Sequence, residues 1–136
     1  MAFIEWTAEY GVGVRQFDVT IKALIAIAND LHDHIRAPKT DQVFSDILAR
    51  LDVLNATEVP KCDALLEQYG YPKAQEHLAQ HAVARAGLAH FRSDLSRSDT
   101  RLLAMEMTNL IKGWLLLHVA SEDKQAGAFL NSKGVY

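Results

Sequence analysis

Residues 71–81 read YPKAQEHLAQH, and this stretch gives the first sign of both the fold and a site. His77 and His81 lie four residues apart, so on an α-helix both imidazoles project from one face, about one turn apart. Two side chains placed in this way can bind one metal ion. On an arbitrary helix, however, the same spacing more often belongs to solvated histidines or to histidines at the edge of a core. The stretch therefore predicts a helix, and a metal site only with support from elsewhere in the chain.

Helical patterns continue on both sides of this stretch. Apolar residues recur at spacings of three and four along three further segments, as in helices with one buried face. Asp18 is the predicted N-cap of the first helix, and Pro60 should kink the second because proline removes a backbone donor. We therefore predict four helices, which span Asp18–Arg36, Thr40 or Asp41 to the turn at residues 70–72, Lys73–Leu95, and Ser98 or Asp99 onward.

The expected packing is all-α. Four helices joined by short connections favour an antiparallel up-down-up-down four-helix bundle. Residues 1 to about 16 contain Gly11, Gly13 and several aromatic residues, and we expect them to form an N-terminal arm that packs along the bundle. A length of 136 residues fits one core, so we predict a single domain over residues 1–136.

The composition is that of an ordinary globular protein, with 49% hydrophobic and 23% charged residues. A formal net charge of −3, without a basic cluster, gives no reason to expect nucleic acid or an anionic membrane as a partner. No apolar stretch approaches the roughly 20 residues that a membrane span needs. The single cysteine, Cys62, cannot form an internal disulfide, and the N-terminal residues lack the pattern of a signal peptide. We therefore expect a cytoplasmic location.

Two further polar residues come from the predicted fourth helix, in the stretch WLLLHVASED at residues 114–123. His118 lies beside the inward positions of that helix, and Asp123 lies near its end. With His77 and His81 they offer three imidazoles and one carboxylate, and helix bundles often build metal sites from facing helices in this way. Imidazoles suit iron, zinc, copper or nickel, and a carboxylate favours iron without excluding the others. The apolar side chains expected to be buried on the same helix are Leu103, Met107, Leu110, Trp114 and Leu117.

Glu58 and Cys62 fall on the inward register of the second helix. A buried ionised carboxylate is costly unless a cation or a proton neutralises it, so Glu58 is a candidate metal ligand. The alternative is that the kink at Pro60 turns Glu58 toward solvent. Cys62 is a weaker candidate, because an inert buried thiol is at least as common as a thiolate ligand. The remaining histidines are expected at the surface, and they are His32, His34 and His90.

Several motifs of this chain occur together in one known family. The patterns YPxxxxHxxxH at residues 71–81 and WLxxHxxxxD at residues 114–123 match its second half. Trp6, YGVGVRQFD at residues 10–18 and KALIAIANDL at residues 22–31 match its N-terminal arm and first helix. On these motifs the chain resembles the bacterial hemerythrins over nearly its whole length. The resemblance implies a four-helix bundle with a non-heme diiron site in its core.

The resemblance also implies roles for individual residues. The residues that match the three-histidine iron are His77, His81 and His118, with Asp123 as a bridge to the second iron. In the family the second iron takes a histidine from the first helix, a histidine from the second, and a bridging glutamate. The residues at those three positions are here Ile21, Glu58 and Cys62. Because oxygen binds at the second iron in the family, we do not expect oxygen carriage by the usual mechanism.

Three interpretations of the altered site remain open. A single ion is held by the three histidines and Asp123, with or without Glu58. Alternatively two ions persist with Glu58 as a new ligand, or the metal is lost and the bundle serves as an interaction module. We expect a hemerythrin-like metal-binding protein with one or two ions, iron first among them, and with dioxygen or another small molecule as its ligand. The sequence leaves open whether oxygen is carried, sensed, or activated as in an oxidase- or oxygenase-like enzyme.

Overall fold

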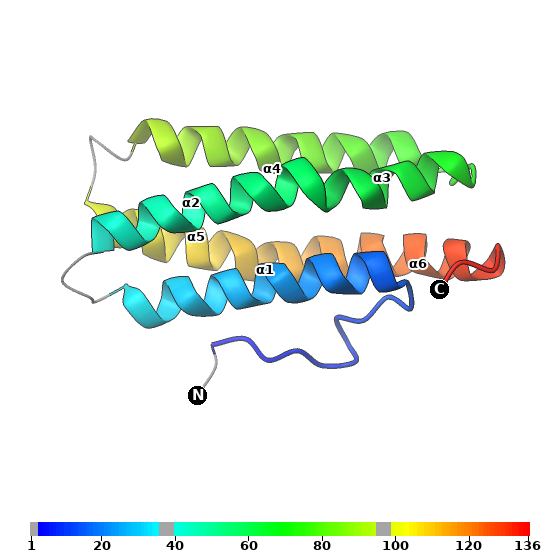
Figure 1. Cartoon of the computed structure of the whole chain (residues 1–136), viewed down its shortest axis with the longest axis horizontal. Helices are drawn as coiled ribbons and strands as arrows, with labels where there is room; N and C mark the ends of the chain where they lie inside the picture. The colour runs from blue at the N-terminus through cyan, green and yellow to red at the C-terminus, as the bar shows by residue number, and fades with distance from the viewer. Residues whose placement is uncertain (1–2, 36–39, 95–98) are drawn as a thin grey trace.

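The computed structural model describes residues 3–35, 40–94 and 99–136. Its helices are α1 (Arg15–His34), α2 (Thr40–Thr57), α3 (Val59–Gln68), α4 (Ala74–Asp94), α5 (Thr100–Trp114), the π-helix η1 (Leu115–Asp123) and α6 (Lys124–Ser132). The pair α2 and α3 forms one long rod, and α5, η1 and α6 form another, so that four rods lie side by side (Figure 1). The predicted all-α four-helix bundle is confirmed. No helix in the described ranges is both long and apolar enough to cross a membrane.

The first helix begins earlier than predicted. Arg15 is its first residue, so the predicted N-cap, Asp18, lies in the first turn instead. The carboxylate of Asp18 accepts a hydrogen bond from the backbone N–H of Val12, with 2.8 Å between the nitrogen and Oδ1. The prediction was wrong because this side chain holds the chain that precedes the helix, and does not cap the helix itself.

The other helix boundaries fall near their predicted positions. Asp99 is the N-cap of α5, and its side chain accepts a hydrogen bond from the N–H of Arg101. The turn before α4 contains Gly70 at a φ of +71°, a conformation that favours glycine. The predicted helix ends at Arg36 and Leu95 lie outside the described residues.

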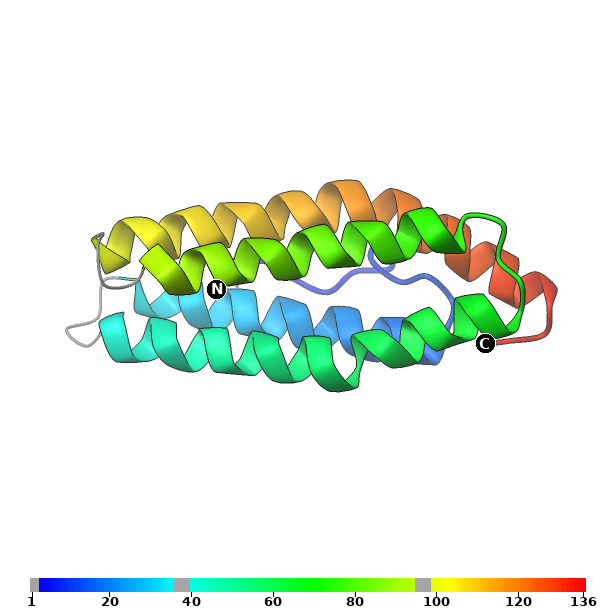
Figure 2. The ribbon, with the colours of Figure 1, turned by 90° about the horizontal axis from the view of Figure 1, so that it is seen from above.

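The rod formed by α2 and α3 bends where the sequence predicts a kink. Pro60 stands in the first turn of α3, where a missing N–H costs little, and Glu58 precedes that helix. The ribbon changes direction at this point (Figure 2). Hydrogen bonding nearly continues across the bend, since the N–H of Glu58 donates to the carbonyl of Leu54 at 3.0 Å and the N–H of Cys62 donates to the carbonyl of Glu58 at 3.4 Å. The predicted kink is confirmed.

The core follows the predicted apolar faces of α1 and α2, but it departs from the prediction on the fourth rod. Leu110 and Leu117, expected to be buried, are 53% and 75% exposed. The buried residues of α5 follow one another at intervals of four, so the buried face passes through position 111 and not 110. The π-helix that follows then turns position 117 away from the core. The residues buried along this face are Leu103, Met107, Ile111 and Leu115.

Residues 3–14 form the predicted arm, which runs along α1 (Figure 1). The side-chain amide of Asn29 exchanges two hydrogen bonds of 2.8 Å with the backbone of Ile4. Further on, the arm crosses α6, where a Cβ atom added at Gly127 would lie 2.2 Å from the carbonyl oxygen of Val12. Only glycine permits so close an approach of the two backbones. The arm thus connects the first rod to the end of the last one.

Candidate metal centre

A π-helical segment brings His118 and Asp123 to one face. In an α-helix, two residues five positions apart point in directions that differ by about 140°. Hydrogen bonding from residue i to i+5 lengthens the turn, so that residues five apart lie on the same side. Both side chains are buried in η1, which spans Leu115–Asp123. The spacing of the two residues therefore fits a π-helix, a rare structure that often marks a functional site.

Four side chains meet where η1 faces α4, and we call them the His/Asp cluster: His77, His81, His118 and Asp123. One ligand atom from each lies within 4.8 Å of all the others. Oδ1 of Asp123 is 2.9 Å from Nε2 of His77 and 3.0 Å from Nε2 of His118. The centroids of the three imidazole rings are 4.7 to 5.1 Å apart. The structure thus brings together the residues that were the first candidates from the sequence.

Several polar atoms of the His/Asp cluster are buried without a partner. The side chains of His77, His118 and Asp123 are 1%, 4% and 9% exposed. Although the distances are short, Nε2 of both rings and Oδ1 of Asp123 do not meet with hydrogen-bond geometry, and they have no other partner within the described residues. Leaving a buried polar atom unpaired costs about 1–3 kcal/mol. An ion among these lone pairs would remove that cost, so the donor set fits a transition metal.

Two side chains that the sequence analysis did not single out orient the imidazoles. Nδ1 of His81 lies 2.7 Å from Oδ1 of Asp63 on α3, and Nδ1 of His118 lies 2.5 Å from Oε1 of Gln80 on α4. Because both partners accept, each imidazole donates through Nδ1 and keeps a lone pair on Nε2. Metal-binding histidines commonly have such a partner. In the sequence, Asp63 could have been suspected only because it follows Cys62, an inward position of the second helix. No feature of the sequence indicates a role for Gln80.

An aromatic side chain and the charge of Asp123 complete the surroundings. Trp114 stacks on His118 with ring centroids 3.9 Å apart and planes inclined by 15°. Burial by itself raises the pKa of Asp123, but contacts with His118 and His77 outweigh it, so the pKa lies below its ordinary value. Asp123 is therefore ionised at neutral pH, and it supplies the negative charge of the His/Asp cluster.

Glu58 lies outside the His/Asp cluster, at the bend between α2 and α3. Its Oε2 accepts a hydrogen bond of 2.8 Å from Nε2 of Gln16, and its Oε1 lies 3.3 Å from Nζ of Lys61. The hydrogen bond from Gln16, followed by that from Lys61, lowers the pKa of Glu58 from its ordinary value. The side chain is 28% exposed, so the premise of an isolated carboxylate in the core is wrong. The role of Glu58 as a ligand stays a prediction.

Cys62 is buried and faces α1, apart from the His/Asp cluster. Its Sγ lies 3.6 Å from Oγ1 of Thr20 and donates to the carbonyl of Gln16 at 3.8 Å. Burial is the main reason that the pKa of Cys62 is raised to about 12. At neutral pH this group is a thiol, whereas a metal ligand must be a thiolate. Its role as a ligand also stays a prediction, while the expected surface positions of His32, His34 and His90 are confirmed.

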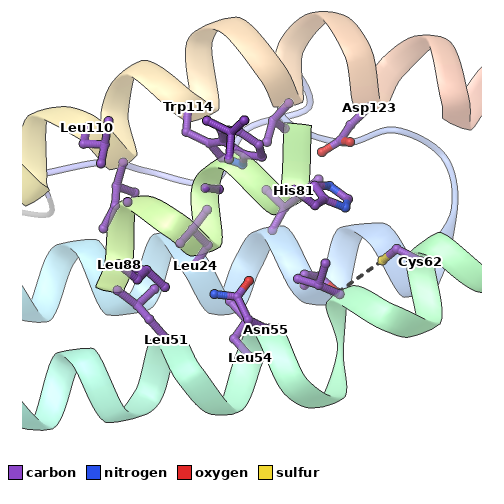
Figure 3. Close-up of a pocket in the computed structure, with 18 of the residues that line it drawn as sticks. Leu24, Leu51, Leu54, Asn55, Cys62, His81, Leu88, Leu110, Trp114 and Asp123 are labelled. Carbon is purple, nitrogen blue, oxygen red and sulfur yellow. Dashed lines mark hydrogen bonds between the residues drawn. The ribbon is translucent and has the colours of Figure 1, made fainter. Parts of the chain in front are cut away.

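A cavity of about 320 Å³ lies inside the bundle, next to the His/Asp cluster (Figure 3). Most of the side chains that line it are aliphatic. His81 and Asp123 form part of its wall, and so do Ile21 and Cys62. An ion bound at the cluster would therefore have one side that faces an apolar space.

Comparison with known proteins decides the fold. No protein family matches the sequence, and no curated protein matches it. A crystal structure of a hemerythrin in which one leucine is changed to alanine matches with a TM-score of 0.76, over 96% of this chain and 98% of that chain. The chain has the hemerythrin fold. Because only 20% of the residues are identical, the likeness concerns the fold and not the activity.

Within this hemerythrin fold, the chain assembles only one group of metal donors. Ile21, at a position where the resemblance implies a histidine, is 3% exposed and packs in the cavity wall. Glu58 is paired at the bend, and Cys62 is a thiol bonded to α1. Among the described residues, the His/Asp cluster is the only group of three or more donors close enough to hold an ion. The hemerythrin fold is thus combined with one group of four residues that could hold a metal ion.

Proposed function

We propose that this protein is a hemerythrin-like non-heme metal protein that binds one transition metal ion, iron first among the candidates. The observation that carries the proposal is the set of buried polar atoms without a hydrogen-bond partner, namely both ring nitrogens of His77, Nε2 of His118 and Oδ1 of Asp123. Nε2 of His81 supplies the fourth donor, since its Nδ1 is engaged by Asp63. Three imidazoles and one carboxylate suit iron, while zinc, copper and nickel are alternatives that the donor set also accepts.

The geometry favours a single ion over two. A second ion would need donors from α1, α2 or α3, and there the chain offers a buried isoleucine, a carboxylate paired with Lys61, and a thiol whose pKa is about 12. Isoleucine has no donor atom, the carboxylate of Glu58 is already engaged by Gln16 and Lys61, and Cys62 would have to lose its proton before it could bind an ion.

The ligand of the ion is proposed to be dioxygen or another small molecule. Bound iron would supply a coordination position open to such a ligand. The chain's own residues determine access to that position, since His81 and Asp123 border the apolar cavity while Trp114 covers His118. Sensing or activation of oxygen fits this arrangement better than carriage, because the donors of the second iron are absent.

Metal analysis of the purified protein, after anaerobic loading with Fe(II), tests the proposal. We expect one equivalent of metal per chain. His81→Ala should lose most of it, whereas His90→Ala, which alters an exposed histidine of the same helix, should retain it. Glu58→Gln should also retain the metal, because Glu58 lies outside the His/Asp cluster.

Other stoichiometries would overturn this proposal in distinct ways. Two equivalents, with one lost in Glu58→Gln, would show that Glu58 holds a second ion. No bound metal in the folded protein would instead favour a metal-free interaction module.

A further inference from the structure

The cavity beside the His/Asp cluster connects the metal donors with the surface. Two of its lining residues, Val83 of α4 and Leu110 of α5, are 72% and 53% exposed, so the cavity reaches the surface between these helices. At its inner end lie His81 and Asp123. A molecule could therefore enter from solvent and reach the donors without crossing the packed core.

The size of the cavity suits a small organic molecule. Its volume of about 320 Å³ is near the lower end of the roughly 300–1,000 Å³ found for small-molecule sites. An apolar cavity of about 150 Å³ already accommodates benzene. The space is thus larger than a diatomic gas needs, and it fits a bicyclic ring or a short chain.

Small side chains on the inner face of α4 create this space. Ala84 and Gly87 line the cavity, and a Cβ atom at Gly87 would meet no atom within 4 Å. Glycine in a helix interior is unfavourable by about 0.5–1 kcal/mol relative to alanine. No close backbone contact requires glycine at position 87. The missing side chain of Gly87 instead leaves room in the cavity.

The polar groups of the cavity wall indicate what the occupant carries. Lysine, arginine and glutamate do not occur among its lining residues, so apart from the metal donors nothing there neutralises a charged molecule. The hydroxyl of Thr20 and the thiol of Cys62 are engaged by the carbonyl of Gln16. The side-chain amide of Asn55 makes no hydrogen bond to any described residue, and Figure 3 shows it among the leucines of the wall. One neutral polar group is thus free to bind a ligand.

We propose that this cavity binds an uncharged, largely apolar organic molecule, about the size of a bicyclic ring, with one polar group bound by Asn55 and its body next to His81 and Asp123. This rests on the proposed function only in placing the molecule beside an ion. The apolar walls supply most of the binding free energy, since burial of apolar surface contributes about 25 cal/mol per Å².

Calorimetric titration with indole, an uncharged bicyclic molecule with one N–H donor, tests the proposal on the metal-loaded protein. We expect one site per chain. Gly87→Leu, which fills the cavity, should weaken binding by about tenfold or more. Gly113→Leu is the matched control, because Gly113 is also a helical glycine with no atom near its Cβ but lies outside the cavity. It should change the affinity by less than about twofold.

Asn55→Leu separates the polar contact from simple filling of space. It should weaken the binding of indole but not that of naphthalene, which has no donor. Circular dichroism of each variant establishes that it is folded.

The outcomes for the cavity and for the metal are distinguishable. Absence of indole binding in folded, metal-loaded protein would overturn the inference and leave the metal proposal standing, and so would equal affinities in Gly87→Leu and Gly113→Leu. Indole binding by protein that never takes up metal would support the cavity and overturn the metal proposal. A change in the metal's absorption spectrum on addition of indole would support the placement of the molecule beside the ion.

Discussion

At the scale of single residues, the His/Asp cluster depends on partners that are not themselves metal donors. Asp63 fixes the ring of His81 from α3, and Gln80 fixes the ring of His118 from α4. Both contacts hold Nε2 toward the centre of the cluster and determine which nitrogen carries the proton. Partners of this kind contribute to metal affinity by orienting the donors.

Asp63→Ala should therefore weaken metal binding by about 10- to 100-fold without unfolding the protein. The physical reason is that His81 loses the acceptor that orients its ring and sets its tautomer. Competition with a chelator of known affinity measures the change. Glu67→Ala, which removes an exposed carboxylate of the same helix, is the control. Equal affinities in the two variants would mean that Asp63 has no positioning role.

Cys62 should be unreactive in the folded protein. Its pKa of about 12 lies about three units above the ordinary value of 9.0, so at pH 8 the thiolate fraction is about a thousandfold lower than in the unfolded chain. The rate of alkylation by iodoacetamide, followed by mass spectrometry with and without denaturant, measures this difference. Rapid alkylation of native protein would show that Cys62 is accessible and ionised.

At the scale of elements, the sequence predicted what depends on local periodicity and missed what depends on distant contacts. The buried faces of α1 and α2, and the break at Pro60, follow from residues within a few positions of one another. Asp63 and Gln80 carry no such signal, because each acquires its role from a histidine on another helix. The burial of Leu110 was predicted wrongly because a step of three residues was placed after Met107 where α5 takes a step of four. That of Leu117 was predicted wrongly because a uniform helical period was extended through η1.

The π-helix can be tested by removing one residue from it. Deletion of Ser121, which is exposed, leaves three residues between His118 and Asp123, so that the two are four positions apart, and an α-helix brings that spacing to one face. The variant should keep both its helicity and its metal. Deletion of Lys112 in α5 should abolish metal binding, because it rotates the whole of η1 by about 100°. Loss of metal in both deletions would mean that the π-helical backbone itself is needed.

The crossing of the arm over α6 gives a prediction of stability. Gly127→Ala places a Cβ atom against the carbonyl of Val12, and the arm must shift to accommodate it. We expect a loss of about 1–3 kcal/mol in the free energy of unfolding by urea. Gly113→Ala, at an open helical position, should instead be neutral or stabilising by up to about 1 kcal/mol. Similar stabilities of the two variants would argue against a close contact between the arm and α6.

At the scale of the whole molecule, the bundle and the metal should stabilise each other. An ion that binds only the folded state at about 100 times its dissociation constant adds about 2.7 kcal/mol, which for a chain of this length raises Tm by roughly 5–15 °C. Differential scanning calorimetry with and without metal measures this shift. In His77→Ala the shift should disappear, and a shift equal to that of the unaltered protein would place the ion elsewhere.

The positions of Ile21 and Cys62 in the cavity wall have an evolutionary consequence. Under the resemblance stated above, these two positions hold a histidine and a glutamate when a second iron is present. The space next to positions 21 and 62 can be filled by metal donors, or it can remain open as a cavity when shorter or apolar side chains stand there. It cannot hold metal donors and an organic molecule at the same time. Two iron atoms and a sizeable organic guest would then be mutually exclusive occupants of one bundle. A lineage could exchange one for the other by substitutions at the few positions that line this volume, with the four rods left unchanged.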